Sequence, residues 1–140
     1  MRRKVTFKWK KLYYYFLVAL QFLTLIPVRL KKGYKSEDLA NSTLFFPSVG
    51  LIIGSLLFII YLIFNSYFPP EITSVFILGG WVYLTGALHL DGLADTIDGL
   101  GGGKDREEIL SIMKDTHTGA KGVAAVVVLM LIKFFLIIQI

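Results

Sequence analysis

Three aspartates, Asp91, Asp95 and Asp98, are the residues of this sequence whose type and spacing best suit chemistry. Their i, i+4, i+7 spacing places them on one face of an α-helix. Carboxylates that share a face repel one another and raise one another's pKa unless a cation joins them. No Lys or Arg lies within residues 91–98. The three aspartates are therefore predicted catalytic residues and ligands of a divalent metal, and the alternative is a solvated acidic stretch at a helix end.

The all-oxygen character of these side chains favours Mg²⁺, Ca²⁺ or Mn²⁺, and Mg²⁺ usually arrives with phosphate. A glycine-rich stretch follows at once, and backbone N–H groups of glycines can converge on an anion. The predicted phosphate-binding residues are Gly99, Gly101, Gly102, Gly103 and Lys104. The alternative for the glycines is a flexible hinge. The dinucleotide-binding fingerprint is excluded because the stretch follows no predicted strand.

A second polar group, formed by Lys114, Asp115 and His117, lies some twenty residues further along the chain. Asp115 is a predicted catalytic residue, with a further metal ligand as one of its possible roles, and Lys114 is predicted to neutralise phosphate. The alternative is an ordinary helix C-terminus, where Lys and His favour the helix dipole. The nearby Gly119–Gly122 segment lacks the Gly-Lys-Ser/Thr ending of a Walker loop.

Composition indicates that membrane-spanning helices position these groups. The chain has 140 residues, 55% hydrophobic and 18% charged, and its mean hydropathy is +0.66. Soluble domains carry about 25% charged residues. We predict an all-α, polytopic transmembrane helix bundle in a single membrane domain over 1–140. Its apolar segments are 12–28, 44–68, 72–90 and 122–140, and a cytoplasmic acidic and glycine-rich loop covers 91–121.

Basic residues orient these segments. Six of the fifteen Lys and Arg residues lie in the first eleven positions, directly before an apolar run, which favours a lipid bilayer over nucleic acid as the partner. The positive-inside rule places 29–43 and 91–121 in the cytoplasm and 65–71 outside, so we expect a multi-pass protein of the cytoplasmic membrane. A fully spanning 12–28 would put one basic cluster outside. That segment is therefore predicted to be re-entrant or to lie in the interface.

Two further features concern local structure. Asp105 followed by Glu108 resembles a capping box, and Ile109, Ile112 and Met113 follow at helical spacing, which predicts a short amphipathic helix near 106–114 on the membrane surface. Lys133 lies deep in the last apolar segment, where it either faces a polar cavity or snorkels to the surface. The chain has no cysteine, so disulfides and cysteine-based metal sites are excluded.

The stretch from His89 to Arg106 resembles the cobalamin synthase family, the adenosylcobinamide-GDP ribazoletransferases. The likeness rests on Asp-Gly-Leu-Ala-Asp from Asp91 and Met-Lys-Asp from Met113, and it continues to Gly122. Upstream it includes Phe22–Val28 and Phe46–Gly50. It thus covers nearly the whole chain, in order.

The resemblance implies a Mg²⁺-dependent transferase of cobalamin biosynthesis that joins adenosylcobinamide-GDP to α-ribazole, or to α-ribazole 5′-phosphate, and releases GMP. The aspartates would then hold the metal on the diphosphate, or one of them would act as general base for the attacking hydroxyl. Family members continue with further spans, whereas this chain stops at Ile140. It is therefore expected to match the N-terminal part of the family, either as a fragment or as a chain that cannot act alone. An oligomer or other enzymes of the pathway are the protein partners considered.

Two other functions are weighed against this one. A CDP-alcohol phosphotransferase needs Ala-Arg where this chain has Asp95 and Thr96, so its pattern fails. A cation transporter subunit usually carries its site near mid-membrane on broken helices. The expected position of Asp91, just past the end of the segment 72–90, favours an enzyme that works on soluble, charged substrates.

Overall fold

The part of the chain that the structure describes is entirely helical. The computed structural model describes residues 2–28, 30 and 33–139, with side chains for these residues from Trp9 onward. Its elements are α1 (Arg2–Leu23), α2 (Ser36–Ser42), the 3₁₀ helix η1 (Thr43–Phe45), α3 (Phe46–Phe64), α4 (Pro70–Thr85), α5 (Leu88–Gly102), α6 (Arg106–Ile112) and α7 (Ala120–Ile137). The predicted all-α class is confirmed.

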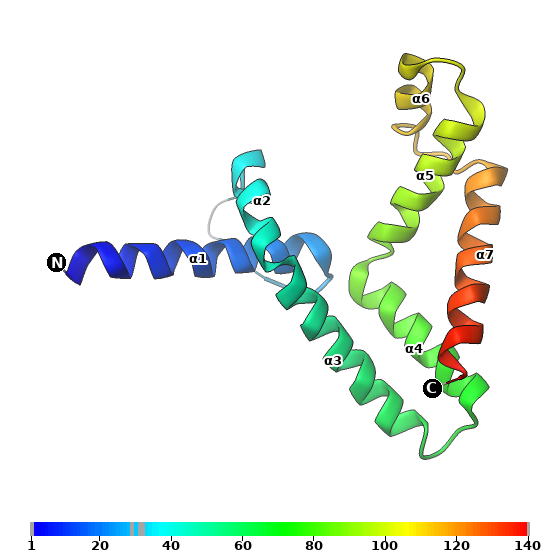
Figure 1. Ribbon diagram of the computed structural model, residues 1–140, viewed down its shortest axis with the longest axis horizontal. Coiled ribbons are helices and arrows are strands. Elements are labelled where there is room, and N and C mark those ends of the chain that lie inside the picture. Colours follow the sequence, from blue (N-terminus) through cyan, green and yellow to red (C-terminus); the bar gives the residue numbers. More distant parts are fainter. Residues whose placement is uncertain (1, 29, 31–32, 140) are drawn as a thin grey trace.

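Helices α3 and α4 form a hairpin, and α7 returns alongside α4 and α5 (Figure 1). The turn between α3 and α4 and the short helix α6 lie at opposite ends of the molecule in this view. Helix α1 crosses the beginning of α3 and extends away from the other helices. The polar stretch after Asp91 thus lies on the α5–α6 side of the molecule, away from α1 and α2.

Within the residues that the structure describes, two helices are long and apolar enough to cross a membrane: the continuous Ser36–Phe64 rod and α7. The bent pair α4 and α5 would be a third span if the pair crosses as one. Large apolar side chains such as Leu51, Phe58 and Phe135 are exposed along these helices, as expected for lipid-facing positions. The chain is therefore a membrane protein.

The segment 72–90, predicted as one continuous span, is broken. Helix α4 ends at Thr85, and α5 starts at Leu88 after a bend of 84°. Both intervening residues have left-handed backbone, with φ of 58° at Gly86 and 59° at Ala87, which ends an α-helix. The N–H of Leu25 donates to the freed carbonyl of Leu84 at 2.8 Å, so the chain after α1 stabilises this break.

Helix α1 does not coincide with the apolar segment 12–28, because it begins well before residue 12 and ends at Leu23. It ends where the hydroxyl of Thr24 donates to the Leu20 carbonyl at 2.6 Å and accepts the N–H of Ile26 at 3.2 Å. Its C-terminal half packs against the start of α3 around a small apolar core. That core contains Ala19, Leu20, Leu23 and Val49.

Lys133 lies against an aromatic ring of the neighbouring helix. Its Nζ lies 4.5 Å from the ring centroid of Trp81, which α4 presents to α7. A cation over an aromatic face is stabilised by the negative charge of the ring face, and more so away from water. The pair therefore provides the charge of Lys133 with a partner between α4 and α7.

Candidate functional site

Helices α5 and α7 pack along each other, and this contact positions the acidic residues. The predicted spacing of Asp91, Asp95 and Asp98 is realised on α5, because α5 is regular from Leu88 to Gly102. The stretch 91–121, predicted as a loop, is thus largely helical. Asp91 lies near the beginning of α5, just after the break, and Asp98 lies near its end.

Asp98 binds the N-terminus of α7. The N–H of Gly119 donates to Asp98 Oδ2 at 2.7 Å, and the N–H of Gly122 donates to Asp98 Oδ1 at 2.8 Å. Gly119 is the N-cap of α7, so these are N–H groups that an isolated helix leaves without partners. A carboxylate here satisfies both donors and favours the positive end of the helix dipole. Asp98 therefore acts as a capping residue contributed by a neighbouring helix.

The close approach of Asp98 explains two glycines. A Cβ on Gly119 would lie 2.5 Å from Asp98 Oδ1. A Cβ on Gly122 would collide with Asp98 Oδ2 and would lie 2.8 Å from the carbonyl oxygen of Ala94. Side chains at these positions would force α7 away from α5, so both glycines are required for the contact.

Asp115 and His117 form a pair beside this contact. Asp115 Oδ1 accepts the backbone N–H of His117 at 3.1 Å and lies 2.7 Å from His117 Nδ1. The hydrogen bond to Asp115 raises the pKa of His117 above its ordinary value. The same bond lowers the pKa of the Asp115 carboxyl. Each side chain of the pair therefore stabilises the charged form of the other.

A cavity of about 340 Å³ brings these polar groups together. It is lined by Asp98, Gly102, Ile112, Asp115, His117, Gly119, Ala120 and Lys121. The Lys121 ammonium donates to the carbonyl of Gly101, so a lysine bridges the end of α5 and the start of α7. Two carboxylates, an imidazole and an ammonium thus surround one space. Such a set suits a ligand that carries both phosphate and a divalent cation.

Asp91 lies on a different cavity of about 350 Å³, lined mainly by apolar residues together with Thr118. Asp95 lies on α5 between Asp91 and Asp98 in the sequence, and its side chain is half-buried. Within the residues described, no three Asp, Glu or His side chains lie close enough to hold a metal ion by themselves. Mg²⁺ commonly binds one or two carboxylates together with substrate phosphates and water. These carboxylates therefore fit a cation that binds together with the substrate, and they do not fit a cation held by protein ligands alone.

The glycine-rich stretch lies mostly within α5, so its N–H groups follow the helix axis and do not converge. The N–H of Gly103 donates to the carbonyl of Gly99 at 2.9 Å. These glycines instead allow close packing. Added Cβ atoms would lie 2.7 Å from Met113 Cγ at Gly99 and from Lys121 Cδ at Gly101, and 2.6 Å from Ile109 Cγ1 at Gly103. Phosphate binding by Gly99, Gly101, Gly102 and Gly103 stays a prediction.

Helix α6 has the predicted cap. Asp105 Oδ1 accepts the N–H of Glu108 at 2.9 Å, and the Glu108 carboxylate accepts the N–H of Lys104 at 2.8 Å. Ile109 and Ile112 are packed against the end of α5, because Gly102 and Gly103 leave room for them.

The lysine that lines the cavity, Lys121, is not one of the two lysines that were predicted to bind phosphate. Lys104 and Lys114 are both exposed, and neither is among the residues that line it. Lys121, one residue into α7, was not predicted as a site residue, and His117 was placed in the second polar group without a role of its own. The sequence signal for them is modest: His117 follows Asp115 in a tight turn, and Lys121 stands at the start of an apolar run.

The matching family model is that of cobalamin-5-phosphate synthase, and it covers residues 15–140. The chain is 40% identical over 121 residues to an adenosylcobinamide-GDP ribazoletransferase of Acetivibrio thermocellus, covering 86% of this chain and 49% of that protein. It is 45% identical over 123 residues to one from Acinetobacter baumannii, covering 87% and 49%. For one from Pseudomonas fluorescens the identity is 46% over 120 residues, covering 85% and 49%.

The chain therefore spans about half the length of the curated relatives it matches. No solved structure matches it.

Proposed function

Because this chain belongs to the cobalamin-5-phosphate synthase family, we propose that the enzyme containing these residues is an adenosylcobinamide-GDP ribazoletransferase. It would join adenosylcobinamide-GDP to α-ribazole, or to α-ribazole 5′-phosphate, in the last steps of cobalamin biosynthesis. The observation that carries this proposal is the cavity at the α5–α7 contact, where Asp98 and Asp115 lie with His117 and Lys121. Carboxylates bind a divalent cation, and cationic side chains bind phosphate.

In the proposed reaction, the hydroxyl oxygen of α-ribazole attacks the phosphorus on the cobinamide side of the diphosphate. A new P–O bond forms, the P–O bond to GMP breaks, and the hydroxyl proton passes to a base. Asp115 and the aspartates of α5 are the candidate bases, since an ionised carboxylate accepts a proton from a positioned hydroxyl. His117 and Lys121 line the cavity and would bind the phosphates of the substrate there. Lys104, Lys114 and the glycine-rich stretch from Gly99 stay predicted phosphate-binding residues, although neither lysine lines the cavity.

Mg²⁺ is the proposed cofactor, and Asp91, Asp95 and Asp98 are its candidate ligands. One or two of them would bind it together with substrate phosphate, because the three do not converge on one point. When bound, it would offset the negative charge that develops on the departing GMP phosphate. The capping bonds of Asp98 leave acceptor capacity on both carboxylate oxygens, because each oxygen has two lone-pair sites. Asp98 can therefore cap α7 and contact a cation with the same carboxylate.

The enzyme is proposed to be a multi-pass protein of the cytoplasmic membrane with its active cavity facing the cytoplasm. The basic residues around α2 and α6 support this orientation under the positive-inside rule. The substrates are soluble and carry phosphate, so a site at the α6 end of the bundle is accessible to them. The broken α4–α5 pair resembles the broken helices of transporters, but the aspartates follow the break, and family membership favours the transferase.

An assay of the full-length protein with adenosylcobinamide-GDP, α-ribazole and Mg²⁺ tests this function. We expect corrinoid product and GMP in equal amounts, and loss of both in Asp95→Asn. Asp105→Asn, which alters a carboxylate that caps α6 away from the cavity, is the matched control and should retain most activity. Absence of GMP release from the wild-type protein would overturn the proposed reaction, and wild-type activity in Asp95→Asn would remove Asp95 from the metal site.

A further inference from the structure

The N-terminal half of α1 is a basic and aromatic surface that the candidate site does not use. Residues 2–11 contain six Lys or Arg residues, and no acidic residue occurs before Glu37. Lys10 and Lys11 are exposed. Trp9 and Tyr13, one helical turn apart, are 68% and 64% exposed. Two large aromatic rings thus lie open beside uncompensated positive charge.

Contacts of its C-terminal half fix the direction of α1. The hydroxyl of Tyr14 donates to Asp38 Oδ2 at 3.3 Å, and the rings of Phe16 and Phe45 meet edge to face with centroids 6.0 Å apart. Val18 and Ala19 are fully buried. These contacts link the helix to α2, η1 and α3, so its free half cannot rotate independently of the candidate spans.

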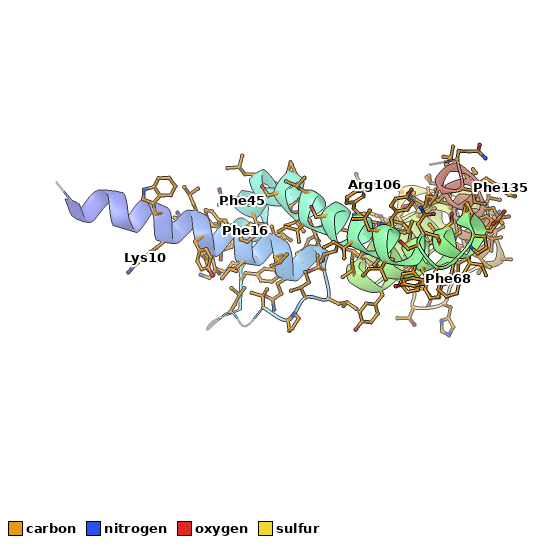
Figure 2. The ribbon with its side chains drawn as sticks, turned by 90° about the horizontal axis from the view of Figure 1, so that it is seen from below. Lys10, Phe16, Phe45, Phe68, Arg106 and Phe135 are labelled. Carbon is orange, nitrogen blue, oxygen red and sulfur yellow. The ribbon has the colours of Figure 1, made fainter. Side chains whose placement is uncertain are left out.

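The resulting direction is across the spans. Helix α1 lies crosswise to α5 and α7 and projects beyond the other helices (Figure 1). Lys10 lies on this projecting part and points away from the rest of the molecule (Figure 2). Of the described helices, those that are long and apolar enough to cross a membrane do not include α1. Helix α1 thus runs across the candidate spans and not along them, and its Lys- and Arg-rich half favours the membrane surface over the bilayer interior.

We propose that the N-terminal half of α1 binds the surface of an anionic membrane. Its Lys and Arg residues pair with lipid phosphates, and the rings of Trp9 and Tyr13 insert at the headgroup level, where amphipathic aromatic rings are most stable. Anionic lipid is the partner because attraction to a negative surface potential complements the charge, while the aromatic rings need an apolar boundary that a free anion lacks. This proposal does not depend on the proposed reaction.

The fluorescence of Trp9 tests the proposal. The chain has two tryptophans, so Trp81→Phe leaves Trp9 as the sole reporter while keeping an aromatic ring against Lys133. The chain is reconstituted in nanodiscs of phosphatidylcholine alone or with added phosphatidylglycerol. We expect the Trp9 emission to shift to shorter wavelength in the anionic discs. The shift should reverse at about 1 M salt, where the Debye length is about 3 Å.

Two charge-reversal pairs provide the matched comparison. Lys10→Glu with Lys11→Glu should abolish the lipid-dependent shift, whereas Lys104→Glu with Arg106→Glu makes the same change of charge near α6 and should preserve it. Circular dichroism in neutral discs shows whether each variant is folded. Identical Trp9 emission in neutral and anionic discs, or a shift that survives the α1 reversal in folded protein, would overturn the proposal.

The cysteine-free sequence permits a second measurement. Single variants Lys10→Cys and Gln21→Cys place one thiol near each end of the part of α1 whose side chains are described. In sealed vesicles, we expect an impermeant maleimide to label Lys10→Cys only from the side that carries α6, as judged by a Lys104→Cys reference. Labelling of positions 10 and 21 from opposite sides would make α1 a membrane span and would end the surface proposal.

Discussion

Two regions of the molecule hold their helices together by different physical means. The apolar corner, formed by the C-terminal half of α1 with η1 and the start of α3, relies on buried aliphatic residues and aromatic pairs. The polar corner, formed by α5, α6 and the start of α7, relies on a carboxylate that binds backbone N–H groups and on glycines that allow close approach. Packing tolerates gradual changes of volume, whereas the polar corner depends on individual atoms.

This comparison has a functional meaning. Chemistry requires groups held within a few tenths of an ångström, and hydrogen bonds to backbone achieve this better than apolar contact alone. The apolar corner needs only to fix the direction of α1. We therefore expect substitutions in the two corners to separate stability from the geometry of the cavity, and the predictions below run from the largest expected effect to the smallest.

Leu20→Ala should have the largest effect on stability. Leu20 is 9% exposed and lies in the apolar corner, and truncating such a residue leaves a cavity that costs about 2–5 kcal/mol in the free energy of unfolding. Unfolding in mixed detergent micelles, followed by circular dichroism, measures the change. Leu51→Ala removes the same atoms from a side chain that is 73% exposed and should cost much less. Equal losses in the two variants would contradict a core at this corner.

Gly122→Ala should cost about 1–3 kcal/mol, the usual penalty for overpacking. The added methyl group collides with Asp98 and with the carbonyl of Ala94, so α7 must move away from α5. The same unfolding measurement applies. Gly79→Ala on α4 is the control, because a Cβ there meets nothing within 4 Å and alanine favours a helix. Stabilisation by Gly122→Ala would show that the close α5–α7 contact is absent.

Asp98→Ala should cost about 1 kcal/mol, the typical effect of removing an N-cap. Asp91→Ala, on the same helix and with the same loss of charge, should cost less because Asp91 does not cap α7. The collision at Gly122 partly involves Asp98, so Gly122→Ala should be less harmful in the Asp98→Ala background. Strict additivity in this double-mutant cycle would contradict the direct contact.

The pairing of Asp115 with His117 should appear as a titration with little effect on stability, because both side chains are exposed. The pKa of His117 is raised in the folded protein. The stability that this pairing contributes through His117 is therefore present below the unfolded pKa of about 6.5 and is lost as pH rises through the folded pKa. Asp115, with its lowered pKa, contributes above about 3.8 and loses this on acidification. Both contributions are therefore present together between these two pH values.

NMR of the imidazole protons measures this directly. In Asp115→Asn, we expect the midpoint of His117 to fall toward its ordinary value. An unaltered His117 midpoint in this variant would mean that Asp115 is not its partner.

Helix content and family could be read from the sequence because both depend on local patterns. Long uncharged stretches indicated α3 and α7, and the Asp105–Glu108 spacing predicted the α6 cap that the structure confirms. The Asp-Gly-Leu-Ala-Asp and Met-Lys-Asp segments indicated the family. The membrane orientation and the metal-binding role of the aspartates stay predictions.

Tertiary contacts decided the rest. The break after Thr85 depends on two left-handed residues and on a hydrogen bond from Leu25, sixty residues earlier in the chain, which no local apolar count reveals. The capping of α7 by Asp98 and the convergence of His117 and Lys121 on one cavity require α5 and α7 to lie side by side. The residue types and their helical spacing are thus properties of the sequence alone. The partners of Asp98 are instead set by helix packing, because it brings together groups that lie more than twenty positions apart.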